Sequence, residues 1–344
     1  MTSVIVVGSG PAGMSAAFFL SLGNVDVTVI ERLGNERYER YHSICGGGIS
    51  RKAFKELSPM VPGGVVNEFS RTRIIWPNGT EVKMRTPGYI LDRPVFLSSL
   101  RKECEDRGVK FVKGSVIDIT YDGRYTVLTY QGDSFSSDWL IGADGCFSTV
   151  RKILFGSSPE DKVATTEFII PGTRNDDLEI RLVADGSGTY TWSFPRGGNT
   201  CTGGKTGYRE RTFSSKGTRF IPFGGIGKIV SEKALLIGDA AAMANPISYG
   251  GLKAAMLSGK IATKAILSDD PDILQKWWDS SILSDGRFLD FNRTLKGWSE
   301  DEMNDAVRPF RHGGLYLPGL WACITRPRNI RMYFGCLFAF RYGW

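Results

Sequence analysis

Residues 3–32 read SVIVVGSGPAGMSAAFFLSLGNVDVTVIER, and they constrain the fold more than any other part of this 344-residue chain. The β-branched runs at both ends predict two buried strands, and the small and apolar residues between them predict a helix. The spacing Gly8-x-Gly10-x-x-Gly13 is typical of a Rossmann unit. In such a unit the first glycine makes the tight turn, the second lets the backbone approach a pyrophosphate, and the third lets the helix pack closely. We therefore expect a dinucleotide at the N-terminus of this helix.

The residues around these glycines fit the same role. Pro11 falls in the first helical turn, where its missing N–H is no loss. Glu31 ends the second strand at the spacing where a carboxylate accepts a hydrogen bond from a ribose hydroxyl, which favours FAD or NAD over NADP. The expected cofactor contacts in this unit are Gly8, Gly10, Pro11, Ala12, Gly13, Glu31 and Arg32.

Two later segments favour FAD. Residues 138–152 read DWLIGADGCFSTVRK, and residues 233–263 contain a buried-strand pattern, ALLIGD, followed by a loop and a helix of small residues. Asp239 ends that strand, where a carboxylate can accept hydrogen bonds from a ribityl chain. The N-terminus of the helix after SYGG can face the flavin pyrimidine edge, where negative charge develops on reduction.

Together these motifs resemble the FAD-dependent superfamily of monooxygenases and reductases of the p-hydroxybenzoate hydroxylase type. The resemblance implies that the Gly–Asp motif contacts the ribityl chain and the isoalloxazine ring, and that the Asp–Gly motif lies near the pyrophosphate. The residues that carry it beyond the first unit are Asp144, Gly145, Arg151, Gly238, Asp239, Pro246, Gly250, Gly251 and Leu252.

Three segments resemble the geranylgeranyl reductase group within that superfamily: CGGGI at 45–49, YILDRPVF at 89–96 and YTWSFPRGG at 190–198. The resemblance implies that residues 45–48 lie over the flavin. The resemblance also implies catalytic positions at Cys45, Gly46 and Gly47. It implies further contacts with the cofactor from Gly48 and Arg93. Cys45 is then a proton donor or a redox-sensitive gate, against the alternative of a small packed hydrophobe.

Two further assignments stay open at this point. Arg93 either faces a phosphate of the FAD or forms a surface ion pair at the start of a helix. Tyr190, Trp192 and Phe194 alternate, so they share one face of a strand and either line a substrate channel or pack in the core. His42 and His312 are interpreted as incidental.

The resemblance implies an enzyme that saturates isolated C=C bonds of a geranylgeranyl or other isoprenoid chain, on a prenyl lipid or quinone. Hydride comes from N5 of reduced flavin, and an acid protonates the other carbon; Cys45 is the first candidate and Tyr249 the second. The electron donor is either NADPH or a small redox protein such as reduced ferredoxin. The alternatives are a flavin monooxygenase or halogenase of an aromatic substrate, and a non-catalytic, membrane-associated flavoprotein that carries electrons.

The expected fold class is α/β, with α+β character in its second part. A Rossmann-type FAD-binding domain is built from residues 1–68, 89–160 and 222–270. It is interrupted by an antiparallel substrate-binding sheet from residues 69–88 and 161–221, and residues 271–344 form a helical region. The segment 207–220 is short and rich in polar residues, whereas the resemblance implies a helix at this place.

Composition excludes several classes of protein. The formal charge of +7 suits an anionic ligand or membrane surface, and no motif indicates nucleic-acid binding. Six cysteines without CxxC spacing predict no metal site and a reduced, cytoplasmic protein. The first residues lead directly into a strand pattern, so no signal peptide is expected, and no apolar run is long enough to span a bilayer.

Residues 313–344 mix aromatic and arginine side chains, which predicts either peripheral contact with the cytoplasmic membrane face or a helix that closes a substrate tunnel.

Overall fold

The computed structural model describes residues 1–342 of the chain. Its first layer is a six-stranded sheet in which β17, β10, β1, β2 and β6 are parallel neighbours and β16 pairs antiparallel at one edge. The strands are β1 (Thr2–Val7), β2 (Val25–Glu31), β6 (Lys110–Lys113), β10 (Trp139–Gly142), β16 (Val230–Ser231) and β17 (Ala234–Leu236). The central strands are buried along most of their length, as expected for a parallel sheet covered on both faces.

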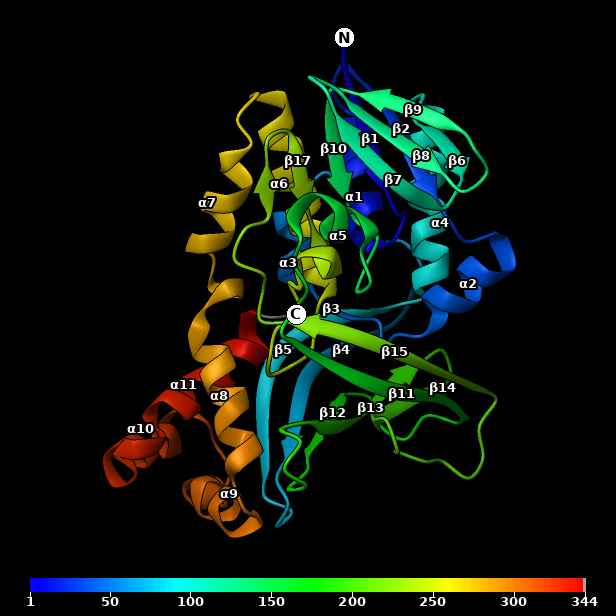
Figure 1. Ribbon diagram of the computed structural model, residues 1–344. Coiled ribbons are helices and arrows are strands. Elements are labelled where there is room, and N and C mark those ends of the chain that lie inside the picture. Colours follow the sequence, from blue (N-terminus) through cyan, green and yellow to red (C-terminus); the bar gives the residue numbers. More distant parts are fainter. Residues whose placement is uncertain (343–344) are drawn as a thin grey trace.

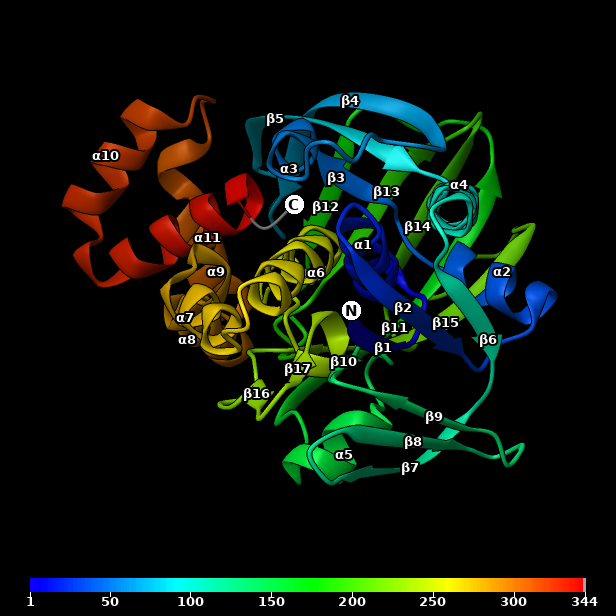
Figure 2. The same cartoon turned by 90° about the horizontal axis from the view of Figure 1, so that it is seen from above.

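Helices cover one face of this sheet and a small β-meander with a short helix covers the other (Figure 2). The covering elements are α1 (Pro11–Leu20), α4 (Arg93–Asp106) and α6 (Leu252–Leu267) on one side, and β7 (Val116–Tyr121), β8 (Tyr125–Thr129), β9 (Ser134–Ser137) and α5 (Thr149–Phe155) on the other. α1 and α6 pack closely because Gly259 has no side chain: a Cβ there would lie 2.7 Å from the Ala12 carbonyl oxygen. This Rossmann-type layer confirms the predicted fold class.

The second layer is an eight-stranded sheet in the order β15-β11-β14-β13-β12-β4-β5-β3. Its strands are β3 (Gly48–Ser50), β4 (Val65–Ile75), β5 (Glu81–Leu91), β11 (Asp161–Pro171), β12 (Leu178–Leu182), β13 (Tyr190–Arg196), β14 (Asn199–Lys205) and β15 (Ser215–Phe223). The prediction of a wholly antiparallel sheet was wrong, since β12 and β4 pair in parallel. Two separate insertions, β3–β5 and β11–β15, meet at these two strands, and their chain directions coincide there. β15 forms an edge of the sheet and includes the end of the polar segment 207–220.

The helical C-terminal region begins beside α6 of the first domain and continues along the second sheet (Figure 1). Its elements are α7 (Asp272–Ser280), α8 (Gly286–Gly297), α9 (Glu300–Val307), α10 (Tyr316–Thr325) and α11 (Ile330–Tyr342). Phe288 and Phe291 of α8 share a buried core with Ile180 and Phe194 of the sheet. The fully buried Asn292 donates to the Pro246 carbonyl oxygen at 2.8 Å, so α8 also supports the loop before α6.

Three short helices complete this description: α2 (Asn35–Ser43) and α3 (Arg51–Glu56) follow the first βαβ unit, and a 3₁₀ turn, η1 (Gly238–Ala241), follows β17. Further 3₁₀ turns are η2 (Ile282–Ser284), η3 (Arg308–Phe310) and η4 (Pro327–Asn329). Gly343 and Trp344, which belong to the expected helical region, lie outside the described residues. Within residues 1–342, none of the helices has the length and apolar character needed to cross a membrane.

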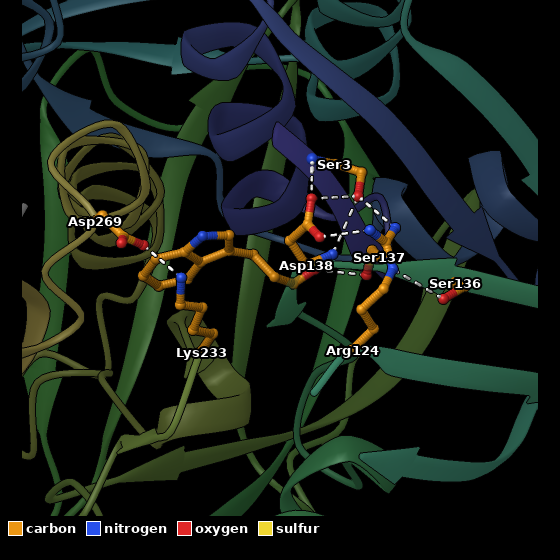
Figure 3. A network of polar contacts seen from close by, with 8 residues as sticks. Ser3, Arg124, Ser136, Ser137, Asp138, Lys233 and Asp269 are labelled. Atoms are coloured by element: carbon orange, nitrogen blue, oxygen red, sulfur yellow. Dashed lines mark hydrogen bonds and ion pairs between the residues drawn. The ribbon is translucent and has the colours of Figure 1, made fainter. Parts of the chain in front are cut away.

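A polar network ties the β-meander to the first strand of the parallel sheet (Figure 3). Asp138 accepts hydrogen bonds from the Ser3 backbone N–H and hydroxyl, both at 2.8 Å, and from Arg124 Nη1 at 2.7 Å. The Ser3 backbone hydrogen bond is the main cause that holds the pKa of Asp138 below its ordinary value. The ionised form of this carboxyl therefore stabilises the fold.

Asp138→Ala should lower the free energy of unfolding by about 2 kcal/mol at neutral pH, because hydrogen bonds to an ionised group contribute about 1.5–3 kcal/mol. Since the folded pKa is depressed, this contribution is present above the unfolded pKa and disappears as pH falls through the folded pKa. Urea unfolding of both proteins at pH 7 and in acid measures the difference. Asp26→Ala, which breaks only an exposed pair with Lys110, is the control and should change the value by less than about 0.5 kcal/mol.

Candidate functional site

One long cavity runs from the carboxyl ends of the parallel strands to the second sheet. Gly8, Glu31, Asp144 and Asp239 line it where β1, β2, β10 and β17 end, which is where open α/β sheets bind their ligands. Residues 45–48, the second sheet and the start of α6 also line it. Segments far apart in the sequence therefore meet in one site.

The glycine loop has the shape of a cradle for a ligand. Gly8 has φ +97°, and a Cβ at Gly13 would lie 1.9 Å from the Gly8 carbonyl oxygen, so the fold itself requires both glycines. Gly10 is different, because its φ of −68° suits any residue and the nearest atom to a Cβ would be His42 Cε1 at 3.5 Å. The protein gives no steric reason for glycine at position 10, but a pyrophosphate in the cavity would give one.

The Glu31 carboxylate stands at the cavity wall beside this loop. Its Oε2 accepts from the Ser9 N–H at 2.9 Å and from the Ser9 hydroxyl at 2.8 Å, and its Oε1 accepts from the Leu33 N–H at 2.8 Å. These contacts fix the carboxylate in place, and its remaining lone pairs can accept from a ribose. Arg32 also lines the cavity.

The two motifs that favoured FAD lie next to each other. Arg151 is buried and donates to the Ala240 carbonyl through Nη1 and to the Cys146 carbonyl through Nη2, both at 2.7 Å, so it joins the Asp–Gly loop to the Gly–Asp loop. Asp144 accepts from the Thr149 N–H at 2.6 Å and thereby holds the start of α5. Burial raises the pKa of Asp239, and the positive charge of Arg219 opposes that rise.

Most of the expected cofactor positions lie on the cavity, and three lie behind its wall. The positions on the cavity are Gly8, Gly10, Pro11, Ala12, Glu31, Arg32, Cys45, Gly48, Arg93, Asp144, Gly145, Asp239, Gly250, Gly251 and Leu252. Gly13, Gly238 and Pro246 are outside this lining. Gly238 has φ +59° and packs against Ala12, and the Pro246 carbonyl is bonded to Asn292.

The segment after α2 brings Cys45 to the cavity. Cys45 is half-buried, and its Sγ accepts from the Gly47 N–H at 3.4 Å. A Cβ at Gly46 would lie 2.7 Å from Phe194 Cδ2, and a Cβ at Gly47 would lie 2.5 Å from the Leu91 carbonyl oxygen. Close packing inside the protein therefore already requires the first two of the three glycines.

Charged side chains surround this segment. Arg93 is buried and donates through Nε to the His42 carbonyl at 2.8 Å and through Nη2 to the Ile44 carbonyl at 3.2 Å. The alternative of a surface ion pair for Arg93 was therefore wrong: the guanidinium turns inward because it satisfies the carbonyls at the end of α2. Glu167 and Arg219 also line the cavity here, and sequence reasoning missed both.

His42, which the sequence analysis interprets as incidental, lies on the cavity. It is buried, lines the cavity and packs on Tyr38 with ring centroids 4.2 Å apart. Burial, reinforced by Arg93 and Arg219, lowers the pKa of His42 to about 2, so the imidazole is neutral. Its Nδ1 has no hydrogen-bond partner among the described residues, and Gly10 is its neighbour in the glycine loop. An orphaned polar atom at this point suits a bound polar ligand.

The aromatic face of β13 forms the far wall. Tyr190, Trp192 and Phe194 all line the cavity, and the Tyr190 hydroxyl donates to the Ser248 carbonyl. Tyr190 and Tyr249 stack with centroids 5.8 Å apart, and burial raises the pKa of Tyr249 to about 12. Phe194 belongs to the core as well, so the two readings of this aromatic face are compatible.

The residues fit FAD as the ligand. The glycine cradle, the fixed Glu31 carboxylate and the joined loops around Asp144 and Asp239 form a continuous lining that suits an extended dinucleotide. The N-terminus of α6 follows Gly251 at the same wall and places a helix dipole there.

Comparison with known proteins agrees with this fit. Residues 1–44 match the family model described as FAD binding domain. Digeranylgeranylglycerophospholipid reductase 1 of Methanothermobacter thermautotrophicus is 26% identical over 78% of each chain, and reductase 2 of Methanococcoides burtonii is 28% identical over 90% of this chain and 87% of its own. A geranylgeranyl bacteriochlorophyll reductase-like structure from Thermoplasma acidophilum has a TM-score of 0.77 at 20% identity, and the match covers 96% of this chain and 98% of that one.

The fold and the family-model match thus define a protein with a Rossmann-type FAD-binding domain and an inserted sheet domain. The sequence relatives indicate a more specific likeness. Over most of its length the chain is similar to the digeranylgeranylglycerophospholipid reductases.

Proposed function

We propose that this protein is an FAD-dependent reductase that saturates isolated C=C bonds of a geranylgeranyl chain carried by a lipid. The observation that supports it is the continuity of one cavity, which joins the glycine cradle to Cys45 and to the aromatic face of β13. The printed names of its sequence relatives, reductases of a digeranylgeranyl lipid, support the same substrate class.

FAD, when bound and reduced, supplies a hydride from N5. The chain supplies the rest. Gly8, Gly10 and Glu31 would hold the dinucleotide, while Tyr190, Trp192 and Phe194 exclude water from an apolar chain. Cys45 holds a proton at Sγ on the same cavity, where it can reach a carbon of the substrate.

Anaerobic turnover tests the proposal directly. The FAD-loaded protein is reduced chemically, incubated with a geranylgeranyl lipid and analysed by mass spectrometry. We expect a gain of two mass units for each double bond saturated. Lipid of unchanged mass after complete oxidation of the flavin by another acceptor would refute the proposed reductase activity and favour an electron carrier.

Repeating the reduction step with NADPH and with reduced ferredoxin identifies the electron donor, because only the true donor bleaches the flavin.

We propose further that the protein meets its lipid at the cytoplasmic face of a membrane through α10. Five large apolar side chains on this helix are exposed, and Leu317, at 81%, is the most exposed of them: Tyr316, Leu317, Leu320, Trp321 and Ile324. The exposed arginines Arg311 and Arg328 lie in the turns that flank α10, and the exposed Arg331 lies in the first turn of α11. Basic residues beside Trp and Leu are typical of helices that lie in an anionic lipid interface.

Replacing both Leu317 and Trp321 with glutamate should weaken binding to anionic vesicles at least about tenfold, because burying one such side chain contributes about 1.5–3 kcal/mol. Vesicle co-sedimentation measures this change. Leu22→Glu is the matched control, since Leu22 is an exposed leucine between α1 and β2, in the other part of the protein, and its variant should bind like the unmodified protein. Equal binding by the double variant would contradict the assignment to α10.

A further inference from the structure

The backbone of residues 44 and 45 is held by four charged side chains from four different elements. Arg93 of α4 and Arg219 of β15 donate to the Ile44 carbonyl oxygen at 3.2 and 3.3 Å. Arg196 of β13 donates to the Cys45 carbonyl oxygen at 2.8 Å. Glu167 of β11 accepts from the Cys45 N–H at 2.9 Å through Oε1.

Glu167 is the acceptor in this group, and it sits deep in the protein. Its side chain is only 5% exposed, on the cavity face of β11. Burial raises the pKa of Glu167, while Arg196, a hydrogen bond with the Cys201 thiol and Arg93 act in the opposite direction. A buried carboxylate of this kind is costly unless charges and donors compensate it, and here the arginines and the Cys45 N–H do so.

The contacts at residues 44 and 45 add to the close packing of Gly46 and Gly47. Cys45 is followed by three glycines, the most permissive residues for backbone conformation. The Cys45 N–H contact with Glu167 and the Cys45 carbonyl contact with Arg196 hold both sides of the residue that carries the thiol. The orientation of Sγ toward the cavity therefore depends on the sheet as well as on the Gly47 N–H, which donates to Sγ.

We propose that Glu167 is a positioning residue for Cys45: its hydrogen bond to the Cys45 N–H fixes the direction in which the thiol faces the cavity. The inference rests on the proposed function for its catalytic consequence. The contact itself is independent of the reaction and can be tested without turnover.

Three variants test the contact in FAD-loaded protein. Glu167→Ala removes the acceptor. Glu167→Gln keeps an acceptor oxygen and removes the charge. Glu167→Asp keeps the charge but withdraws the carboxylate by one methylene. Glu179→Ala is the matched control, since it removes a carboxylate of β12 that contacts Arg73 and Arg181 outside the cavity.

The first readout is the rate at which N-ethylmaleimide alkylates Cys45, followed by peptide mass spectrometry. Freeing the glycine segment in Glu167→Ala should raise this rate at least about tenfold, since local opening exposes a half-buried thiol. Glu167→Asp should lie between Glu167→Ala and the unmodified protein. Glu167→Gln and Glu179→Ala should stay within about threefold of the unmodified protein, because the first keeps the hydrogen bond and the second never contacts it.

The second readout is lipid saturation. Glu167→Ala should lower kcat by about 10–100-fold with KM within about threefold, because misplacing a reacting group by about 1 Å costs on that order. Glu167→Gln should restore most of the rate.

Alkylation of Cys45 at the unmodified rate in both Glu167→Ala and Glu167→Asp would overturn the proposal. Alkylation of Glu167→Gln as fast as Glu167→Ala would also overturn it, because the effect would then follow charge and not the hydrogen bond. A failure of the proposed function has a different signature: the unmodified protein saturates no lipid, while the alkylation rates of the variants still differ as expected.

Discussion

Cys45→Ala should lower the rate of double-bond saturation by about 10²–10⁴-fold, the range that general acid catalysis contributes. The thiol lies on the cavity between the glycine cradle and the aromatic face of β13, and an unactivated alkene needs a proton on one carbon as hydride reaches the other. The bound flavin should remain, because the FAD contacts proposed for the glycine loop and Glu31 are untouched. Mass spectrometry of the lipid and absorbance of the flavin measure the two quantities separately.

Cys45→Ser and Cys336→Ala complete that experiment. The serine variant keeps a small polar side chain with a far weaker acid, so its rate should stay close to that of the alanine variant. Cys336 is a half-buried thiol of α11, outside the cavity lining, and its loss should leave the rate within about twofold. Unmodified rates in both Cys45 variants would remove the thiol from the mechanism and direct attention to Tyr249.

Gly10→Ala should weaken FAD binding by about a hundredfold, or about 2.7 kcal/mol, while the FAD-free protein stays folded. The backbone angles at Gly10 are ordinary and the nearest atom to the new Cβ is 3.5 Å away, so the methyl group occupies only the space expected for the pyrophosphate. Titration of the FAD-free protein with FAD, followed by flavin fluorescence, measures the affinity.

Gly13→Ala provides the contrast. Its Cβ would lie 1.9 Å from the Gly8 carbonyl oxygen, so the backbone must shift. We expect the free energy of unfolding to fall by about 3 kcal/mol or more, as overpacking against backbone does. If Gly10→Ala binds FAD as well as the unmodified protein, the cradle does not hold a pyrophosphate.

The sequence alone was enough to predict the parts of the site that depend on short segments of the chain. The Gly8–Gly13 spacing, Glu31 at a strand end and the loop before α6 are each set by a short segment, and each contributes residues to the cavity lining. Their contacts with FAD remain predictions. The roles assigned to Cys45 and to Tyr190, Trp192 and Phe194 remain predictions, although all four residues line the cavity.

The rest depends on contacts between distant segments. Glu167 sits in the run TTEFII, where a glutamate normally indicates an exposed strand position, and its burial becomes evident only when the 44–45 segment covers it. Arg219 lies in the segment where a helix was expected from the family, and β15 places it beside Ile44. The parallel pairing of β12 with β4 joins residues more than a hundred positions apart and has no local signal.

The buried bond from Asn292 to the Pro246 carbonyl has a practical consequence for anyone shortening this protein. The C-terminal helices are not a separately removable domain. A fragment ending after α6 would leave Ile180, Phe194 and Ile247 uncovered, because α8 shares their core, and it would strip the support from the loop that leads into α6. Such a fragment should aggregate and lose the yellow colour of bound flavin even though it keeps every glycine of the nucleotide fingerprint.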